Sequence, residues 1–115
     1  MLEDLNGRLE AAALSLTGQG PIKERLSDAY CTYLQDIAES DLPALGAEFG
    51  QMIQALHRAP ALPGDDVVRA SVRKLSNREA CYYAELVVKL YGSLAGLKQQ
   101  LAGARGARPL AATGT

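Results

Sequence analysis

The sequence contains few of the residues from which metal centres and disulfide frameworks are built. Its 115 residues include one histidine, two cysteines and no tryptophan. A metal ion needs three or four converging ligands, and His57 with the widely separated Cys31 and Cys81 does not supply them. Two dispersed cysteines also form no disulfide framework. We therefore expect no metal site and no cofactor, and we expect the cysteines to be small buried hydrophobes, with a redox switch as the alternative.

Long hydrophobic runs are absent as well. No stretch approaches the ~20 apolar residues of a membrane-spanning helix. The N-terminus, Met1 to Asp4, is acidic and lacks the basic start and apolar middle of a signal peptide. These absences predict a cytoplasmic protein that does not enter a membrane.

The motifs of common catalytic and nucleotide-binding sites are also missing. The chain has no Walker loop, no Gly-x-Gly-x-x-Gly turn and no Gly-x-Ser-x-Gly elbow. His57 stands beside Arg58 at the end of a predicted helix, a position typical of capping by cations rather than of catalysis. We therefore expect no catalytic residues and no enzymatic activity.

Apolar residues make up 48% of the chain and recur with the three-then-four spacing of amphipathic helices. No segment alternates with the period of two that is typical of a strand. The sequence thus predicts an all-α fold, a small helical bundle of four to five helices with a long C-terminal helix. The expected helices cover approximately residues 2–16, 22–37, 42–57, 66–75 and 77–102.

Local residues predict where these helices begin and where the domain ends. The expected N-terminal caps are Ser40 or Asp41 for the third helix, Asp65 and Asp66 for the fourth, and Ser76 with Glu79, as a capping box, for the fifth. The length suits one domain, which we place at residues 1–103. Residues 104–115 show no periodicity and are expected to form a flexible tail.

Charge is divided unevenly along the chain. Residues 1–57 carry nine acidic and three basic residues, and residues 58–115 carry nine basic and four acidic residues. One interpretation is that the basic residues pair with the acidic half or are simply solvated. The other is a surface that faces an acidic protein or a phosphate backbone. The densest basic patch consists of Arg69, Arg73, Lys74 and Arg78.

Two pairs of glycines lie four residues apart within predicted helices, Gly46 with Gly50 and Gly92 with Gly96. Each interior glycine costs a helix ~1 kcal/mol relative to alanine. Close approach of another segment would offset this cost. Alternatively, the glycines lie on a solvent-exposed face that tolerates them, or they mark a bend, and no close approach is then required. The spacing therefore predicts close packing at both pairs, with the tolerant face or bend as the alternative.

The last predicted helix is longer than its neighbours, about 39 Å at 1.5 Å per residue. Its C-terminal leucines, Leu94, Leu97 and Leu101, should therefore extend beyond a compact bundle and need cover. Leucines of the first helix can provide that cover within the chain. The same stripe of a second copy can also provide it, which would give a two-fold dimer.

The same helix is apolar around much of its circumference. Tyr82 and Tyr83 point about 100° apart, and Leu86 and Val88 share the side of Tyr82. Such a helix is either central to a bundle or part of an interface. Tyrosine suits interfaces because its large ring can be buried while its hydroxyl stays hydrated.

These features predict a small helical protein-interaction module, a regulator, antiactivator, chaperone or adaptor, which binds a protein partner as a homodimer. The alternative is a nucleic-acid-binding regulator with a basic helix-turn-helix-like element around residues 65–90. The predicted partner-binding residues are Arg69, Arg73, Lys74, Arg78, Tyr82 and Leu86. The predicted dimer interface contains Gly92, Gly96, Leu94, Leu97 and Leu101.

Overall fold

The computed structural model describes residues 2–42, 44–60, 63–64 and 66–106. This part of the chain contains helices and no strand, so the predicted all-α fold with a long C-terminal helix is confirmed. None of its helices combines the length and the apolar character needed to cross a bilayer. In chain order the elements are α1 (Leu2–Ser15), α2 (Ile22–Ala29), the π-helical turn η1 (Tyr30–Leu34), the 3-10 turn η2 (Glu39–Asp41), α3 (Gly46–Leu56), α4 (Val67–Arg73) and α5 (Asn77–Gly106).

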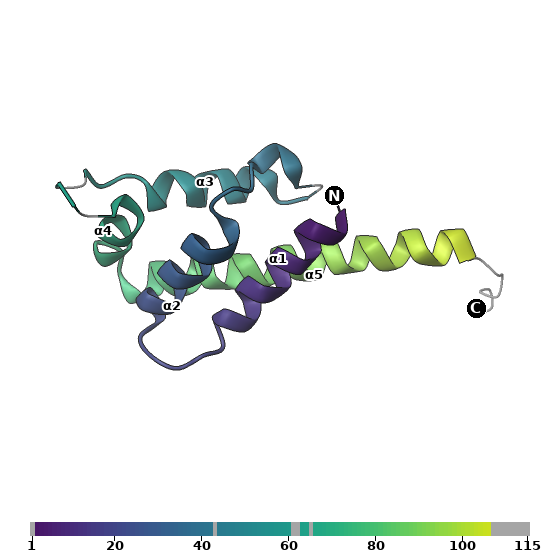
Figure 1. Cartoon of the computed structure of the whole chain (residues 1–115), viewed down its shortest axis with the longest axis horizontal. Helices are drawn as coiled ribbons and strands as arrows, with labels where there is room; N and C mark the ends of the chain where they lie inside the picture. Colours follow the sequence, from purple (N-terminus) through teal and green to yellow (C-terminus); the bar gives the residue numbers. More distant parts are fainter. Residues whose placement is uncertain (1, 43, 61–62, 65, 107–115) are drawn as a thin grey trace.

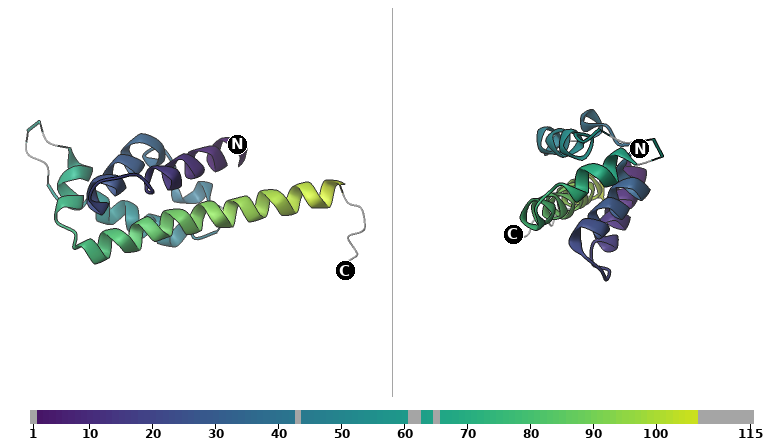
Figure 2. Two further views of the ribbon diagram at one scale, coloured as in Figure 1. Left: turned by 90° about the horizontal axis from the view of Figure 1, so that it is seen from below. Right: turned by 90° about the vertical axis from the view of Figure 1, so that its left-hand side faces the viewer.

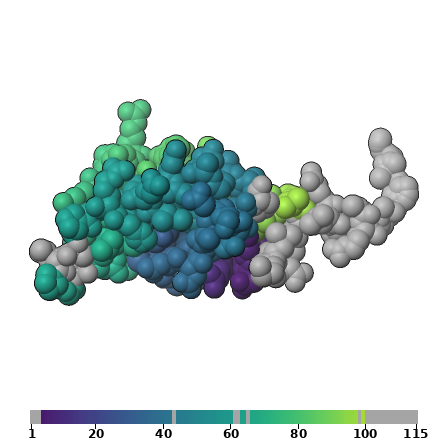
Figure 3. All heavy atoms as spheres, turned by 90° about the horizontal axis from the view of Figure 1, so that it is seen from above, coloured from purple at the N-terminus to yellow at the C-terminus, as the bar shows by residue number. Residues whose placement is uncertain are grey.

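Helix α5 is the axis on which the other helices pack. It contacts α1, α2 and α3, while α4 contacts α2 and α3 (Figure 1). In Figure 2 (left) α1 and α2 lie on one side of α5, and α3 lies behind it. In Figure 3, α3 and the segment before it cover a different face, and α5 emerges beyond them. Within the described part of the chain, one side of α5 is therefore left without a neighbouring helix.

The core forms where the apolar stripes of these helices meet. Two aromatic rings lie within it, since Tyr30 and Phe49 are almost completely buried. The three-then-four spacing of the sequence brings leucines and valines of each helix to the same interior. The largest of its fully buried side chains are Tyr30, Phe49, Leu9, Leu26, Leu34, Met52, Leu56, Leu90, Leu94, Val68, Val72 and Val87.

The leucine stripe of α5 is covered by α1 of the same chain. Leu94 is only 2% exposed and belongs to the same core cluster as Leu5 and Leu9. Leu97 packs partly buried against this cluster, while the side chain of Leu101 lies outside the described residues. The burial of Leu94 therefore needs no second copy.

Two of the predicted helix starts are confirmed by hydrogen bonds. The Asp66 Oδ1 atom accepts from the backbone N–H groups of Val68, at 2.8 Å, and Arg69, at 3.1 Å. At the start of α5, the Ser76 N–H donates to Glu79 Oε1, and the Glu79 N–H donates to Ser76 Oγ. The hydrogen bonds with Ser76 also lower the pKa of the Glu79 carboxyl. Asp65 lies outside the described residues.

The predicted start of the third helix is wrong. Helix α3 begins at Gly46, after Leu45 in a left-handed conformation with φ 62° and no side-chain cap. The Asp41 Oδ2 atom instead accepts from the Ala38 N–H at 3.0 Å and closes the separate turn η2. The Asp41 carboxylate is thus used in a local hydrogen bond within η2, and it does not cap α3. Pro43 lies outside the described residues.

Two other boundaries differ from the prediction. Helix α2 ends at Ala29 and continues as one π-helical turn through Leu34, so it is not a single α-helix to residue 37. Helix α5 continues to Gly106, which carries helical backbone into the expected tail. The remainder of that tail, residues 107–115, lies outside the described part of the chain.

The two glycine pairs have different surroundings. A Cβ atom at Gly46 would lie 2.9 Å from the Glu39 carbonyl oxygen, and one at Gly50 would lie 2.6 Å from Glu39 Oε1. Close packing, predicted at both pairs, is therefore present at Gly46 and Gly50. A Cβ at Gly92 or Gly96 would have no neighbour within 4 Å among the described residues, so this second pair lies on an open face of that part of the chain.

We expect Gly46→Ala to destabilise the fold by about 1–3 kcal/mol, because the methyl group would press on a backbone oxygen of Glu39 that cannot rotate away. The matched control is Gly7→Ala in α1, where a Cβ meets no atom within 4 Å. That substitution should stabilise the protein by about 0.5–1 kcal/mol through helix propensity. Urea denaturation measures both values, and equal effects of the two substitutions would contradict the close approach.

Candidate functional site

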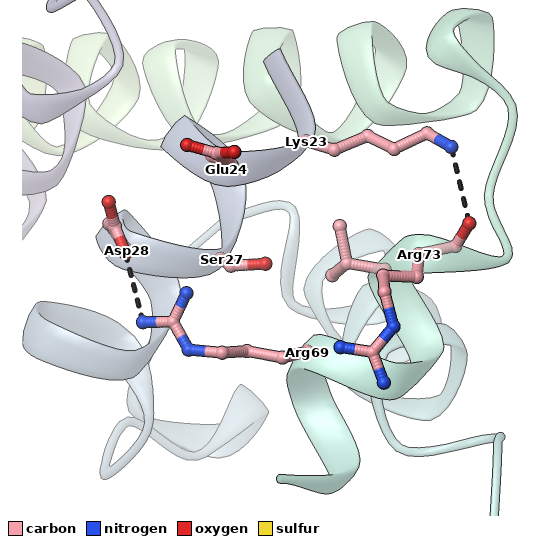
Figure 4. Close-up of a pocket in the computed structure, with 7 residues that line it drawn as sticks. Lys23, Glu24, Ser27, Asp28, Arg69 and Arg73 are labelled. Atoms are coloured by element: carbon pink, nitrogen blue, oxygen red, sulfur yellow. Dashed lines mark hydrogen bonds and ion pairs between the residues drawn. The ribbon is translucent and has the colours of Figure 1, made fainter. Parts of the chain in front are cut away.

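The predicted basic residues of α4 line a shallow cleft between α2 and α4. The cleft has a volume of about 300 Å³ and is shown in Figure 4. Cations and carboxylates face each other across it, with Ser27 pointing toward α4. The lining residues are Lys23, Glu24, Ser27, Asp28, Arg69, Val72 and Arg73.

The sequence of α4 explains how its arginines reach this cleft. Arg69 and Arg73 are four residues apart and therefore share one side of the helix. Val68 and Val72 are both 1% exposed and hold the helix against the core. The Asp66 cap fixes the first turn, so the arginines project from a well-anchored helix.

Part of the positive charge in the cleft is neutralised within the chain. The Arg69 Nη2 atom lies 2.9 Å from Asp28 Oδ1, an ion pair that also raises the pKa of the Arg69 guanidinium. The Lys23 Nζ atom donates to the Arg73 carbonyl oxygen at 3.2 Å. The interpretation in which the basic residues pair with the acidic half of the chain thus holds for Arg69. The pair is exposed to solvent, so it contributes little to stability.

Cys31 lies near this ion pair but is not an activated thiol. Burial raises the pKa of its thiol, the carboxylates of Asp66 and Asp28 raise it further, and the Arg69 guanidinium opposes them. The thiolate is the nucleophilic form, so a raised pKa disfavours reaction at Cys31. Cys81 is exposed on α5, contrary to the expectation that both cysteines are buried.

The six predicted partner-binding residues do not form one surface. Arg69 and Arg73 line the cleft, whereas Lys74 and Arg78 are exposed where the chain enters α5. Tyr82 is 53% exposed on α5. Leu86 is only 5% exposed and belongs to the core cluster, so its side chain is not available to a partner.

On the exposed side of α5 the sequence predicts Arg78, Tyr82, Gly92 and Gly96 as site residues but not the residues between them. Val88 is 50% exposed there, and Tyr82 contacts Tyr83 edge-to-face with ring centroids 5.3 Å apart. Most residues of this surface are polar or glycine, so they do not form an apolar stripe in the sequence. Their three-and-four spacing is nevertheless visible there. We call it the outer face of α5 and define it by Arg78, Cys81, Tyr82, Glu85, Val88, Lys89, Gly92 and Gly96, all exposed.

A second hollow, of about 400 Å³, lies between α1 and the segment after η1. It is predominantly acidic, with Asp4, Asp36 and Asp41 in its lining, and Arg8 lies 3.7 Å from Asp4. Among the described residues, no group of three or more histidine, cysteine, aspartate or glutamate side chains could hold a metal ion. His57 lies elsewhere, with its ring against the edge of Tyr30 at 5.8 Å.

A comparison of the chain with protein-family models, curated protein sequences and solved structures finds no match in any of the three.

Proposed function

We propose that this chain is a small helical protein-interaction module that acts by binding another protein, and that it does so as a homodimer. The observation that carries the proposal is the outer face of α5. Tyr82 and Val88 are 53% and 50% exposed on it, in a helix whose opposite side is sealed by α1, α2 and α3. The two side chains lie at opposite edges of this face, about 120° apart around the helix, and exposed aromatic and aliphatic side chains on a rigid helix are typical of an interface.

The length of α5 supports the same function. Its 30 residues correspond to about 45 Å of helix, and its last turns project beyond the other helices (Figure 1). A projecting helix offers contact area to another chain without rearrangement of the core. Regulators, antiactivators, chaperones and adaptors all act through such contacts, and the proposal extends to this group as a whole.

A second surface suits an acidic segment of a protein partner. It consists of the exposed Lys74 and Arg78 together with Arg73 at the edge of the cleft. Complementary charge at the rim of an interface mainly accelerates association and selects the partner. Arg69 holds Asp28, and we assign the contact with the partner to Arg73, Lys74 and Arg78.

The nucleic-acid alternative has one feature in its favour and one against it. Helices α4 and α5 follow each other across a short turn, as a helix-turn-helix element requires. The carboxylates of Glu24 and Asp28, however, lie in the same cleft as the arginines and would repel phosphates. A gel-shift assay at two salt concentrations separates the two functions, since only phosphate binding would give a complex at low salt that is lost at high salt.

The test of the basic surface uses the immobilised full chain and an extract of the cells that make it. The wild type should retain one stoichiometric partner, and Arg73→Glu with Lys74→Glu should lower the affinity for it about tenfold. Leu14→Ala, an exposed substitution on α1, is the matched surface control and should have no effect. Equal retention of the partner by the charge-reversed variant would exclude the basic surface as the partner contact. A monomeric chain that retains no partner would overturn the proposed function.

A further inference from the structure

We propose that the outer face of α5 pairs with the same face of a second copy in antiparallel orientation, around a two-fold axis at the level of Val87. This inference rests on the proposed function and names the occupant of its principal surface. It uses residues that α1 leaves uncovered and does not require the buried Leu94.

The first support is the spacing of the exposed residues. In the outer face they recur at intervals of four and three, so they form one continuous stripe along the helix that a second helix can follow. Residues of the same helix that face the bundle, such as Val87 and Leu90, fall outside this stripe and are buried. The exposed positions of the stripe are Arg78, Tyr82, Glu85, Lys89, Gly92 and Gly96.

The second support is charge. In an antiparallel pair centred at residue 87, Glu85 of each copy lies opposite Lys89 of the other, and the two-fold axis forms this contact twice. Neither side chain has an ion pair within the described part of the chain. Both charges are therefore available to the second copy.

The third support is shape. The same register places the ring of Tyr82 opposite Gly92 of the second copy, and Arg78 opposite Gly96. A Cβ at either glycine would meet nothing within 4 Å, so each glycine leaves a notch on the helix surface. A large ring set against a notch lets the helices approach closely. The pairing thus gives these glycines the close neighbour that Gly46 and Gly50 find in Glu39.

Other registers do not match in this way. A parallel pair would set Glu85 against Glu85 and Lys89 against Lys89, with like charges in contact. An antiparallel pair shifted one heptad toward the N-terminus sets Arg78 against Lys89. A shift toward the C-terminus sets Lys89 against Gly92 and leaves its charge unpaired. The register at Val87 is the one that pairs every charge at the centre.

A charge-swap experiment tests the pairing. Sedimentation equilibrium should show the wild type as a dimer, and Glu85→Lys or Lys89→Glu should each weaken dimerisation about tenfold or more. The double variant should recover most of the wild-type affinity, because the swap restores opposite charges at both contacts. Since both side chains are exposed, circular dichroism should show all four proteins equally helical. A double variant no better than either single one would overturn the pairing.

Cross-linking tests the orientation. In the proposed dimer the two Val88 residues lie one residue from the axis, and the two Cys81 residues are about 18 Å apart along it. A bis-maleimide much shorter than this distance should link Val88→Cys in a Cys81→Ser background but leave the wild type unlinked. Linkage of both proteins would indicate a parallel pair and overturn the inference. A monomeric wild type that still retains a protein partner would overturn the inference alone, with the proposed function left standing.

Discussion

Leu94→Ala is expected to destabilise the fold by about 2–5 kcal/mol. Leu94 is 2% exposed in the cluster that α1 and α5 share. Its truncation would remove buried apolar surface and leave a cavity, because the two packed helices can collapse only partly around it. The effect is large because the contact attaches α1 to α5, the axis on which the bundle packs.

The matched control is Leu14→Ala, which makes the same chemical change at a side chain that is 64% exposed on α1. It should alter the free energy of unfolding by no more than about 0.5 kcal/mol. Urea denaturation of the two variants measures the difference. A loss at Leu94 no greater than that at Leu14 would mean that α1 does not cover the leucine stripe.

Phe49→Ala is expected to cost about 3–5 kcal/mol. Phe49 is the one phenylalanine of the sequence and is fully buried in the central cluster. It projects from α3, which packs on α4, α5 and the turn η2. Its loss should loosen α3 from the bundle, and thermal unfolding followed by circular dichroism would record a lower midpoint.

Tyr82→Ala is the comparison for that substitution. Tyr82 is an aromatic side chain of similar size but 53% exposed, and its ring contacts Tyr83. Its truncation should cost the fold no more than about 1 kcal/mol, while dimerisation should weaken. A Tyr82→Ala protein as unstable as Phe49→Ala would show that this residue belongs to the core and not to the interface.

The sequence predicted those parts of the fold that local chemistry decides. The apolar spacing was sufficient for the all-α fold and for a long last helix. Asp66 and the pair Ser76 and Glu79 cap their helices as expected, because a cap is formed by residues within one turn of each other.

Elsewhere two local structures competed for the same residue. Asp41 was expected to cap a helix, but its carboxylate accepts a hydrogen bond from the backbone N–H of Ala38, earlier in the chain. Periodicity could not reveal this choice, since both uses of the side chain satisfy a backbone donor. The π-helical turn from Tyr30 to Leu34 was equally hidden, because one widened turn barely disturbs the spacing of the apolar residues.

The site depended on contacts between distant parts of the chain. Arg69 finds Asp28 across 41 residues of sequence, and no motif indicates such a pair. Leu86 and Val88 were placed on one side of the last helix, yet the first is 5% and the second 50% exposed. The direction from which α1, α2 and α3 approach α5 decides between them, and that direction is a property of the whole bundle.

The two sides of α5 therefore have two different roles. Its inner side, with Val87, Leu90 and Leu94, is sealed by other helices of the same chain. Its outer face, with Tyr82 and Val88, is covered by no other helix of the described residues. The first role explains why the bundle is stable, and the second explains why we propose that it binds proteins.

Sedimentation equilibrium of the full wild-type chain across the micromolar range tests this account most directly. If the outer face of α5 associates as proposed, the measured mass will rise toward twice the 12.2 kDa of the single chain as the concentration increases. A mass that stays at 12.2 kDa throughout that range would contradict it.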